Sequence, residues 1–206
     1  MTKKRSEKEI KKYYDSKKGS NELEVQDYMI GDKPITYSLY EKMIIIPIKE
    51  NLQFNENDIV LDVGCGTGLV LKEIEKKVKS IEGIDISQNL LDFYKGESKL
   101  YCNSVLDFEY KQNYYTKIYM VSVSIHFESL DYFKLAVTNL LGALAKGGTL
   151  LIGDQLIAEF HNSKKYFCLH LEDLTAFLIE LGYHFSIKCQ VKEFRYRNRY
   201  DILIYK

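Results

Sequence analysis

The sequence has 206 residues, of which 46% are hydrophobic, and its 29 lysine and arginine residues balance 29 aspartate and glutamate residues. This length and apolar content predict one compact domain with a substantial core. The balanced charge excludes a global field that would attract nucleic acid or an acidic membrane. The apolar runs are far shorter than the roughly 18 residues of a membrane helix, and the lysine-rich start lacks the apolar core of a secretory signal. We therefore expect a cytoplasmic protein.

The first 57 residues differ from the remainder because they show no alternation of strands and helices. Their pattern predicts a charged helix over residues 6–17 and an amphipathic helix over residues 37–46. Glycine, proline and polar residues predict turns at residues 19–21 and 31–34. We expect residues 1–57 to form a helical extension that caps a site on the domain formed by residues 58–206.

Short apolar runs alternate with helical patterns from residue 58 onward. This alternation predicts a doubly wound, mostly parallel sheet with helices on both faces. The expected strands cover residues 59–63, 80–86, 100–105, 117–123 and 149–153. The expected helices cover residues 68–78, 131–145 and 171–181, with a further helix capped by Ser87. Residues 185–194 and 200–205 predict a closing antiparallel hairpin, the sixth and seventh strands, with Arg195, Arg197 and Arg199 at its solvated tip.

A glycine-rich turn stands between the first predicted strand and its helix, where residues 60–68 read Val-Leu-Asp-Val-Gly-Cys-Gly-Thr-Gly. Glycine permits positive φ and close approach of a ligand to the backbone, and a helix start offers free N–H groups. Asp85 ends the next strand, where a carboxylate can accept both hydrogen bonds of a ribose diol. Together they predict an adenosine-type ligand. A dinucleotide is disfavoured, because Leu69 stands where its fingerprint requires a third glycine.

Residues 61–68 resemble the first motif of the class I S-adenosylmethionine-dependent methyltransferases. Residues 83–87 are similar to the acidic second motif of that family, and residues 144–152 to its Lys-Gly-Gly element. The resemblance implies a Rossmann-like fold, S-adenosylmethionine as cofactor and S-adenosylhomocysteine as product. By the same resemblance the turn lines the methionine portion, Asp62 orients its amino group, Asp85 holds the ribose and Ile86 flanks adenine. The turn residues assigned in this way are Gly64, Cys65, Gly66 and Gly68.

Two departures from the family pattern concern the adenine side and the acceptor. Many members have Gly-Asp-Ala after the third strand, whereas this chain has Asn103-Ser104-Val105, so we assign Ser104 and Val105 to adenine. Val121, in the fourth strand, completes the expected cofactor set. Residues 121–127 contain no Asn-Pro-Pro-Tyr sequence, which counts against amino-methylation of adenine or glutamine amides in the manner of that motif.

Two side chains after predicted strands are candidates for catalysis. His126 follows the fourth strand, at the edge where open α/β sheets bind ligands, and is a candidate general base for an acceptor hydroxyl. A structural histidine is an equally open interpretation. Asp154 follows the fifth strand and is a candidate for positioning the acceptor. No metal site is expected.

These features predict an S-adenosylmethionine-dependent methyltransferase that modifies an oxygen or nitrogen of a small-molecule acceptor. One alternative is a methyltransferase of protein or RNA. The lysine-rich start and the arginine hairpin would then bind the macromolecule. Another is a non-catalytic accessory protein that binds the cofactor. Neither a membrane nor nucleic acid is an expected partner, and the sequence leaves the oligomeric state open.

Overall fold

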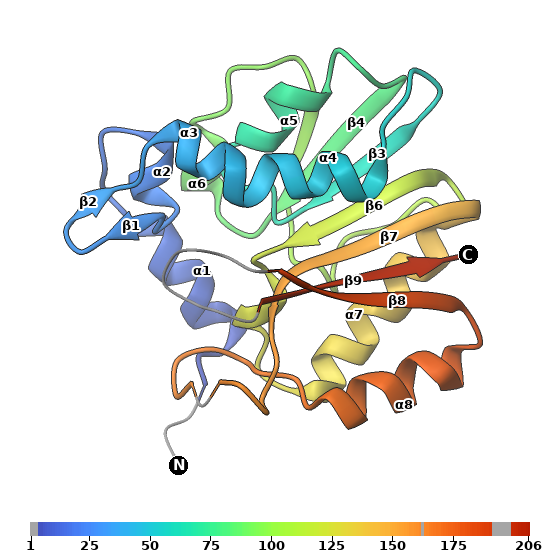
Figure 1. Ribbon diagram of the computed structural model, residues 1–206. Coiled ribbons are helices and arrows are strands. Elements are labelled where there is room, and N and C mark those ends of the chain that lie inside the picture. Colours follow the sequence, from blue (N-terminus) through green and yellow to red (C-terminus); the bar gives the residue numbers. More distant parts are fainter. Residues whose placement is uncertain (1–3, 162, 191–198) are drawn as a thin grey trace. The chain divides into compact units, whose positions relative to one another are not determined.

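The computed structural model describes residues 4–161, 163–190 and 199–206. The chain divides into two compact units, one formed by Lys8–Glu109 and the other by residues 110–206 with the described residues before Lys8. Seven strands follow the sheet order β5-β4-β3-β6-β7-β9-β8 (Figure 1). The predicted Rossmann-like, mostly parallel, seven-stranded sheet with a C-terminal antiparallel hairpin is therefore confirmed.

Three parallel strands form the centre of the 8–109 unit: β3 (Ile59–Val63), β4 (Ser80–Asp85) and β5 (Lys99–Cys102). Four of the five residues of β3 are buried, as its unbroken apolar run predicts. In the register of the strands, Val63 lies opposite Ile84 and Asp85 opposite Cys102. The carboxyl ends of all three strands thus share one edge. The helices α5 (Leu69–Ile74) and α6 (Gln88–Leu91) begin at this edge.

The extension before β3 contains more structure than its sequence pattern predicted. Helix α1 (Glu7–Asp15) is confirmed, whereas the four-residue helix α2 (Glu22–Val25) was not expected. The predicted turn over residues 31–34 lies within a short hairpin of β1 (Met29–Ile30) and β2 (Lys33–Pro34). Gly31 makes that turn at φ +60°, which glycine adopts without steric cost.

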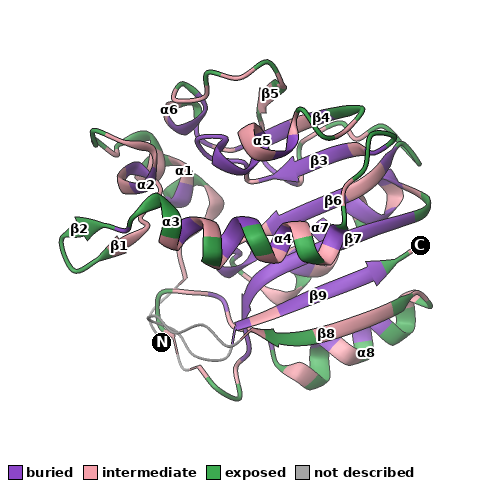
Figure 2. Ribbon diagram, turned by 45° about the horizontal axis from the view of Figure 1, so that its top comes forward, coloured by how far each residue is buried: buried purple, intermediate pink, exposed green. Residues whose placement is uncertain are grey.

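A long helical segment follows, made of α3 (Tyr37–Tyr40), the π-helical η1 (Glu41–Ile45) and α4 (Ile46–Leu52). The expectation that this helix ends at Ile46 is wrong. Pro47 falls in the first turn of α4, where its missing N–H is tolerated. Ile48 and Leu52 are each only 1% exposed, so burial favours the continuation. Buried and exposed residues alternate along α4 in Figure 2.

The 110–206 unit contains β6 (Tyr115–Val121), β7 (Leu144–Leu156), β9 (Arg199–Tyr205) and β8 (His184–Gln190). β6 and β7 are parallel, whereas β9 runs antiparallel to both β7 and β8. Helices α7 (Leu130–Ala143) and α8 (Leu171–Leu181) lie side by side along these strands (Figure 1). The rings of Phe133 and Phe177 join the two helices at a centroid distance of 6.4 Å.

Two expectations in this unit need correction. The fifth predicted strand covers Leu144–Leu156 instead of residues 149–153, because Leu144 already pairs with Tyr115 across a register shift in β6. Arg199 was expected at a solvated tip but is 5% exposed and bonded to Asp154. Alternation in a strand defines a face but not the partner that covers it. Arg195 and Arg197 lie outside the described residues.

None of the helices in the described part of the chain is long and apolar enough to cross a bilayer.

Candidate functional site

The glycine turn after β3 has the backbone geometry that its sequence requires. Gly64, Gly66 and Gly68 have φ values of +74°, +56° and +74°, all in the left-handed region that glycine occupies freely. The turn is fixed to β4, since the carbonyl oxygen of Ile84 accepts hydrogen bonds from Gly64 N at 2.7 Å and Cys65 N at 3.0 Å. Gly68 also provides the N-cap of α5. The backbone therefore folds tightly over the carboxyl end of the sheet.

Asp85 connects the end of β4 to this turn. Its Oδ2 accepts a hydrogen bond from Gly66 N at 2.9 Å, and its Oδ1 accepts one from Ser87 N at 2.8 Å. Burial, with a smaller contribution from the nearby Asp15 carboxylate, raises the pKa of Asp85 to about 6 despite these two bonds. Each carboxylate oxygen has more than one acceptor site, so a diol that donated two hydrogen bonds would stabilise the charged form. The residue is suited to a ribose.

Cys65 lies within this turn, Asp62 lies near the end of β3 just before it, and both side chains are buried. Burial raises the pKa of the Cys65 thiol well above its ordinary value, and the charges of Asp62 and Asp85 raise it further. The thiol therefore stays neutral and packs as a small apolar side chain. A β-carbon on Gly83 would lie 2.8 Å from Cys65 Sγ, so glycine in β4 makes room for it. Cys65 shapes the turn and is not a reactive nucleophile.

The start of α6 is bound by the N-terminal helix. Lys11 Nζ donates to the carbonyl oxygen of Ile86 at 2.7 Å, and Ser87 Oγ donates to Asp15 Oδ1 at 2.7 Å. Asn89 Nδ2 donates to the carbonyl oxygen of Tyr14 at 3.0 Å. Helix α1 is thereby attached next to Asp85, in the same unit. A charged helix gives no sequence signal for such partners, which explains why Lys11 and Asp15 were missed.

Gln26, directly after α2, lies against the glycine turn. Its Nε2 donates to Thr67 Oγ1 at 2.7 Å, and a β-carbon built on Gly66 would collide with its carboxamide oxygen. Gly66 therefore permits both a left-handed backbone and the close approach of this side chain. The glycine spacing predicts the first property but contains no information on the second.

Ser104 and Val105 follow β5 at the edge that Asp85 occupies, and both are buried. The hydroxyl oxygen of Ser104 accepts a hydrogen bond from Leu106 N at 3.1 Å. The loop after β5 is thus held in a defined turn beside the end of β4.

In the 110–206 unit, Asp154 lies within β7 and not after it as expected, and it belongs to a buried polar group. Ser122 Oγ donates to Asp154 Oδ2 at 2.7 Å, and Arg199 Nη1 lies 3.5 Å from the same oxygen. Arg199 Nη1 also donates to the carbonyl oxygen of Asp154 at 2.8 Å. Ser122 and Asp154 have φ values of +61° and +62°, which non-glycine residues adopt at an energetic cost. Val121, which precedes Ser122, pairs with Gly153 in the sheet.

His126 lies after β6 in the short 3₁₀ helix η2 (Ser124–His126). Its half-buried ring meets the Tyr166 ring edge to face at a centroid distance of 5.6 Å. The structure thus joins Asp154 to Ser122 and Arg199, and His126 to Tyr166. Sequence patterns singled out His126 and Asp154 as candidates but did not indicate these partners, which lie far away along the chain or carry no motif.

A family model described as a methyltransferase domain matches residues 60–148, which include the glycine turn and Asp85. Over this stretch the chain is similar to S-adenosylmethionine-dependent methyltransferases, and solved structures of such enzymes share its fold. The match begins in β3 and reaches the Lys-Gly-Gly segment of β7.

Proteins similar to this chain were found both by sequence and by structure, and the solved structures share its fold at low sequence identity. It is similar to a probable ribosomal RNA small subunit methyltransferase A of Methanococcus aeolicus, with 31% identity over 111 residues, which are 48% of this chain and 41% of the relative. The chain spans less than half the length of the curated relatives it matches. Magnesium protoporphyrin IX methyltransferase of Synechocystis, with bound S-adenosylhomocysteine, has a TM-score of 0.65 at 12% identity and covers 96% of this chain and 97% of its own. The [4+2]-cyclase SpnF has a TM-score of 0.66 at 16% identity, covering 79% of each chain.

Proposed function

We propose that this chain is a methyltransferase, which transfers a methyl group from S-adenosylmethionine to an oxygen or nitrogen of a small-molecule acceptor and releases S-adenosylhomocysteine. The observation that carries this proposal is the buried Asp85 carboxylate bonded to Gly66 N of the left-handed glycine turn. This pairing places a ribose acceptor beside the backbone of the glycine turn within one unit of the chain.

The proposed roles of the cofactor residues follow the order of their elements. The turn receives the amino-acid end, Asp62 orients its amino group, and Asp85 accepts hydrogen bonds from the ribose. Ile86, Ser104 and Val105 contact the adenine, and Val121 contributes from β6. The turn residues in this proposal are Gly64, Cys65, Gly66 and Gly68.

When bound, the donor supplies a methyl group already activated by a sulfonium. The chain's own task is to hold the acceptor in line, about 3 to 3.5 Å from that methyl group, and to exclude water. In the proposal His126 removes the proton of an acceptor hydroxyl. Asp154, held by Ser122 and Arg199, positions the acceptor. An amine acceptor needs only to be in its deprotonated form, whereas a hydroxyl gains more from a base.

Residues 1–57 form a cap over the cofactor site in this proposal. Three bonds within the 8–109 unit support this role, because Lys11, Asp15 and Tyr14 all bind the segment that follows Asp85. A cap at that position protects the ligand from water, which strengthens electrostatic interactions with it.

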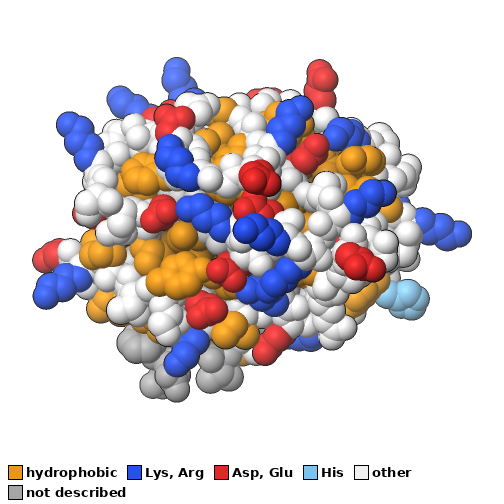
Figure 3. Space-filling view, turned by 90° about the horizontal axis from the view of Figure 1, so that it is seen from above, with side chains coloured by type: hydrophobic (Ala, Val, Ile, Leu, Met, Phe, Trp, Pro, Cys, Tyr) orange, Lys and Arg blue, Asp and Glu red, His pale blue; other side chains and the backbone are white. Residues whose placement is uncertain are grey.

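The charge distribution favours a small acceptor over a nucleic acid. On the face that Figure 3 shows, the described lysine and arginine side chains lie among aspartate and glutamate side chains rather than in one basic patch. RNA is the second candidate acceptor, because the Methanococcus relative is named as a ribosomal RNA methyltransferase. Binding through phosphates would make such a reaction steeply salt-dependent.

Formation of S-adenosylhomocysteine, measured by mass spectrometry with pools of small hydroxyl and amine compounds or with RNA, tests the proposal. We expect product with a small acceptor, at a rate that changes little between 50 and 200 mM salt. Product with RNA alone, and a rate that falls steeply over this range, would favour the macromolecular alternative. Cofactor binding without product from any pool would favour the accessory protein.

For a hydroxyl acceptor found in this screen, His126→Asn tests the proposed base. We expect kcat to fall by about 10² to 10⁴ while affinity for S-adenosylhomocysteine is retained. His170→Asn is a matched control, because the exposed His170 contacts Glu159 after β7. Equal activity of the two variants would leave His126 with only a structural role.

A further inference from the structure

One side chain at the glycine turn comes from outside every motif of the family resemblance. Gln26 Nε2 donates to Thr67 Oγ1 at 2.7 Å and to the carbonyl oxygen of Glu22 at 3.0 Å. Its Oε1 lies so close to Gly66 that a β-carbon built on this glycine would be only 2.0 Å from the oxygen. The carboxamide thus covers the centre of the turn.

This position of Gln26 is built by its neighbours. Asn21 caps α2, its Oδ1 accepting from Leu23 N at 3.1 Å and Glu24 N at 3.0 Å. Lys72 of α5 pairs with Glu22 of α2 at 3.1 Å, which ties α2 to the helix that the turn begins. The short segment before Gln26 is therefore anchored at its start and along its length.

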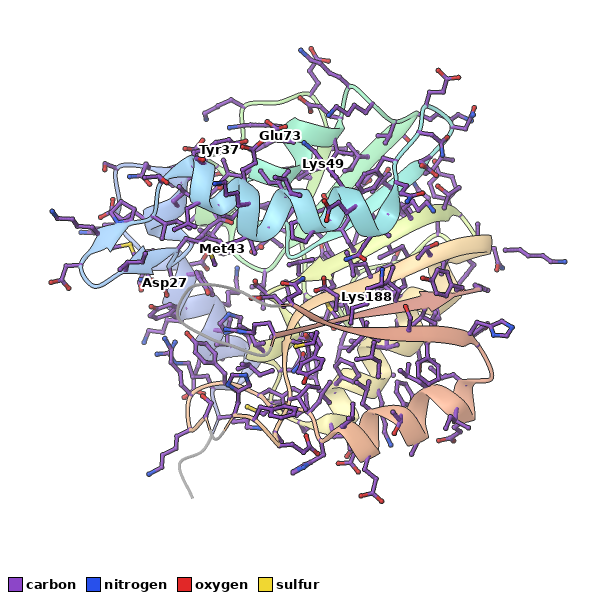
Figure 4. The ribbon with its side chains drawn as sticks, in the orientation of Figure 1. Asp27, Tyr37, Met43, Lys49, Glu73 and Lys188 are labelled. Carbon is purple, nitrogen blue, oxygen red and sulfur yellow. The ribbon has the colours of Figure 1, made fainter. Side chains whose placement is uncertain are left out.

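The residue after Gln26 is anchored as well. Asp27 has φ +64° and accepts hydrogen bonds from Tyr13 and Lys17, and Figure 4 shows it beside α1. A non-glycine residue in the left-handed region persists only where its surroundings hold it there. Gln26 is thus fixed from both sides, and its carboxamide has little freedom to turn away from Gly66.

The orientation of the carboxamide defines its chemistry. Both hydrogens of Nε2 are directed at Glu22 O and Thr67 Oγ1, which leaves Oε1 facing the turn. Thr67 N approaches this oxygen only to 3.4 Å, and a carbonyl oxygen has two lone pairs. A neutral acceptor oxygen fixed over the turn is suited to the hydrogens of an ammonium group.

We infer that Gln26 belongs to the cofactor site and that its Oε1 accepts a hydrogen bond from the α-ammonium group of the donor's amino-acid end. The inference rests on the proposed function and adds to it a residue that the N-terminal extension contributes to recognition. Gln26 then serves beside Asp62, and the extension selects for ligands that have an amino-acid end.

Two ligands separate this role from a structural one. S-adenosylhomocysteine has the amino-acid end, whereas 5′-deoxy-5′-methylthioadenosine has the same nucleoside without it. In Gln26→Met, titration calorimetry should show affinity for S-adenosylhomocysteine reduced about tenfold or more, because a bond to a charged group is lost. Affinity for methylthioadenosine should stay unchanged. Gln112→Met, at an exposed glutamine in the loop before β6, is the matched control and should bind both ligands as the wild type does.

Other outcomes would overturn the inference. An equal loss of affinity for both ligands would show that Gln26 only shapes the turn. Unchanged or tighter binding of S-adenosylhomocysteine would show that the Gln26 side chain only fills space beside the turn. Gln26→Asn, which withdraws the carboxamide by one methylene, should give the same selective loss if the methionine variant fails to fold. Wild-type protein that binds neither nucleoside would overturn the proposed function itself, and the role of Gln26 with it. Failure of the inference alone leaves wild-type binding intact.

Discussion

Asp85 combines burial with incomplete hydrogen bonding, a combination that folding alone does not favour. A raised pKa in the folded state means that the protonated form is favoured there, so this residue's contribution to stability declines as pH rises through about 6. At neutral pH the free protein therefore holds a buried charge at a cost. A ligand that donates hydrogen bonds to that charge offsets the cost, which explains why such a residue fits a binding site.

The pKa of Asp85 leads to a pH-dependent affinity. As pH falls from 7.5 to 5, we expect the affinity for S-adenosylhomocysteine to weaken, approaching tenfold per unit below about 6, because the ribose binds the charged carboxylate. In Asp85→Asn the affinity should be low and nearly independent of pH. Calorimetry across this range provides the measurement. Wild-type affinity that stayed constant down to pH 5 would contradict the ribose role.

Arg199 and Asp154 form an ion pair in which both side chains are nearly fully buried. Removing one partner leaves the other charge without compensation, which typically costs about 3 to 5 kcal/mol. We predict a loss of that size in the free energy of unfolding for Arg199→Met, measured by urea denaturation. Combining it with Asp154→Asn should restore part of the stability. A loss below about 1 kcal/mol in the single variant would show that the pair is unimportant for the fold.

The elements of the sheet were predictable where local pattern determines them. The apolar run of β3 became a strand at its expected position, because parallel strands buried on both faces require such runs. The strands β4, β5 and β6 also lie near their expected positions, although β5 is only partly buried. The limits of α4 and β7 were not predictable. Leu52 belongs to the helix because its side chain is buried, and Leu144 belongs to the strand because it pairs with Tyr115. Both are tertiary contacts that no sequence window contains.

Interactions of the helices on the surface of the 8–109 unit show the same limit. Glu73 of α5 accepts hydrogen bonds from Tyr37 at 3.0 Å and Lys49 at 2.9 Å, and Figure 4 shows the three side chains gathered between their helices. Partial burial and then the neighbouring Glu73 carboxylate raise the pKa of Tyr37 to about 12. Three residues from three elements meet here, and no spacing in the chain indicates it.

Helix α1 should respond to the cofactor, because Lys11 and Asp15 bind the segment that follows Asp85. We predict that S-adenosylhomocysteine slows amide hydrogen exchange over residues 7–17 in the wild type. Asp15→Ala should lose most of this protection. Glu9→Ala, an exposed acidic residue of the same helix, should retain it. If the ligand left the rate of amide hydrogen exchange in α1 unchanged, the proposal that the extension caps the cofactor site would be contradicted.

For the whole molecule, the sequence was most informative where backbone conformation and chemistry coincide. The sequence predicts a turn that only glycine makes easily, at Gly64, Gly66 and Gly68, and Asp85 follows at the end of the next strand. The partners that hold these residues, such as Gln26 and Lys11, come from an extension without motifs. The balanced charge favours a small acceptor, whereas the fold carries no signal for the acceptor's identity, because the Rossmann-like scaffold hosts many reactions.

Titration calorimetry of the full chain at pH 7.5, with S-adenosylmethionine, S-adenosylhomocysteine and a nicotinamide dinucleotide in parallel, tests most directly whether the glycine turn and Asp85 bind a sulfonium nucleoside. We predict saturable binding of the first two ligands, loss of that binding in Asp85→Asn, and none with the dinucleotide. Tight binding of the dinucleotide by folded protein, with no heat from either sulfur nucleoside, would contradict the proposed cofactor and the reaction built on it.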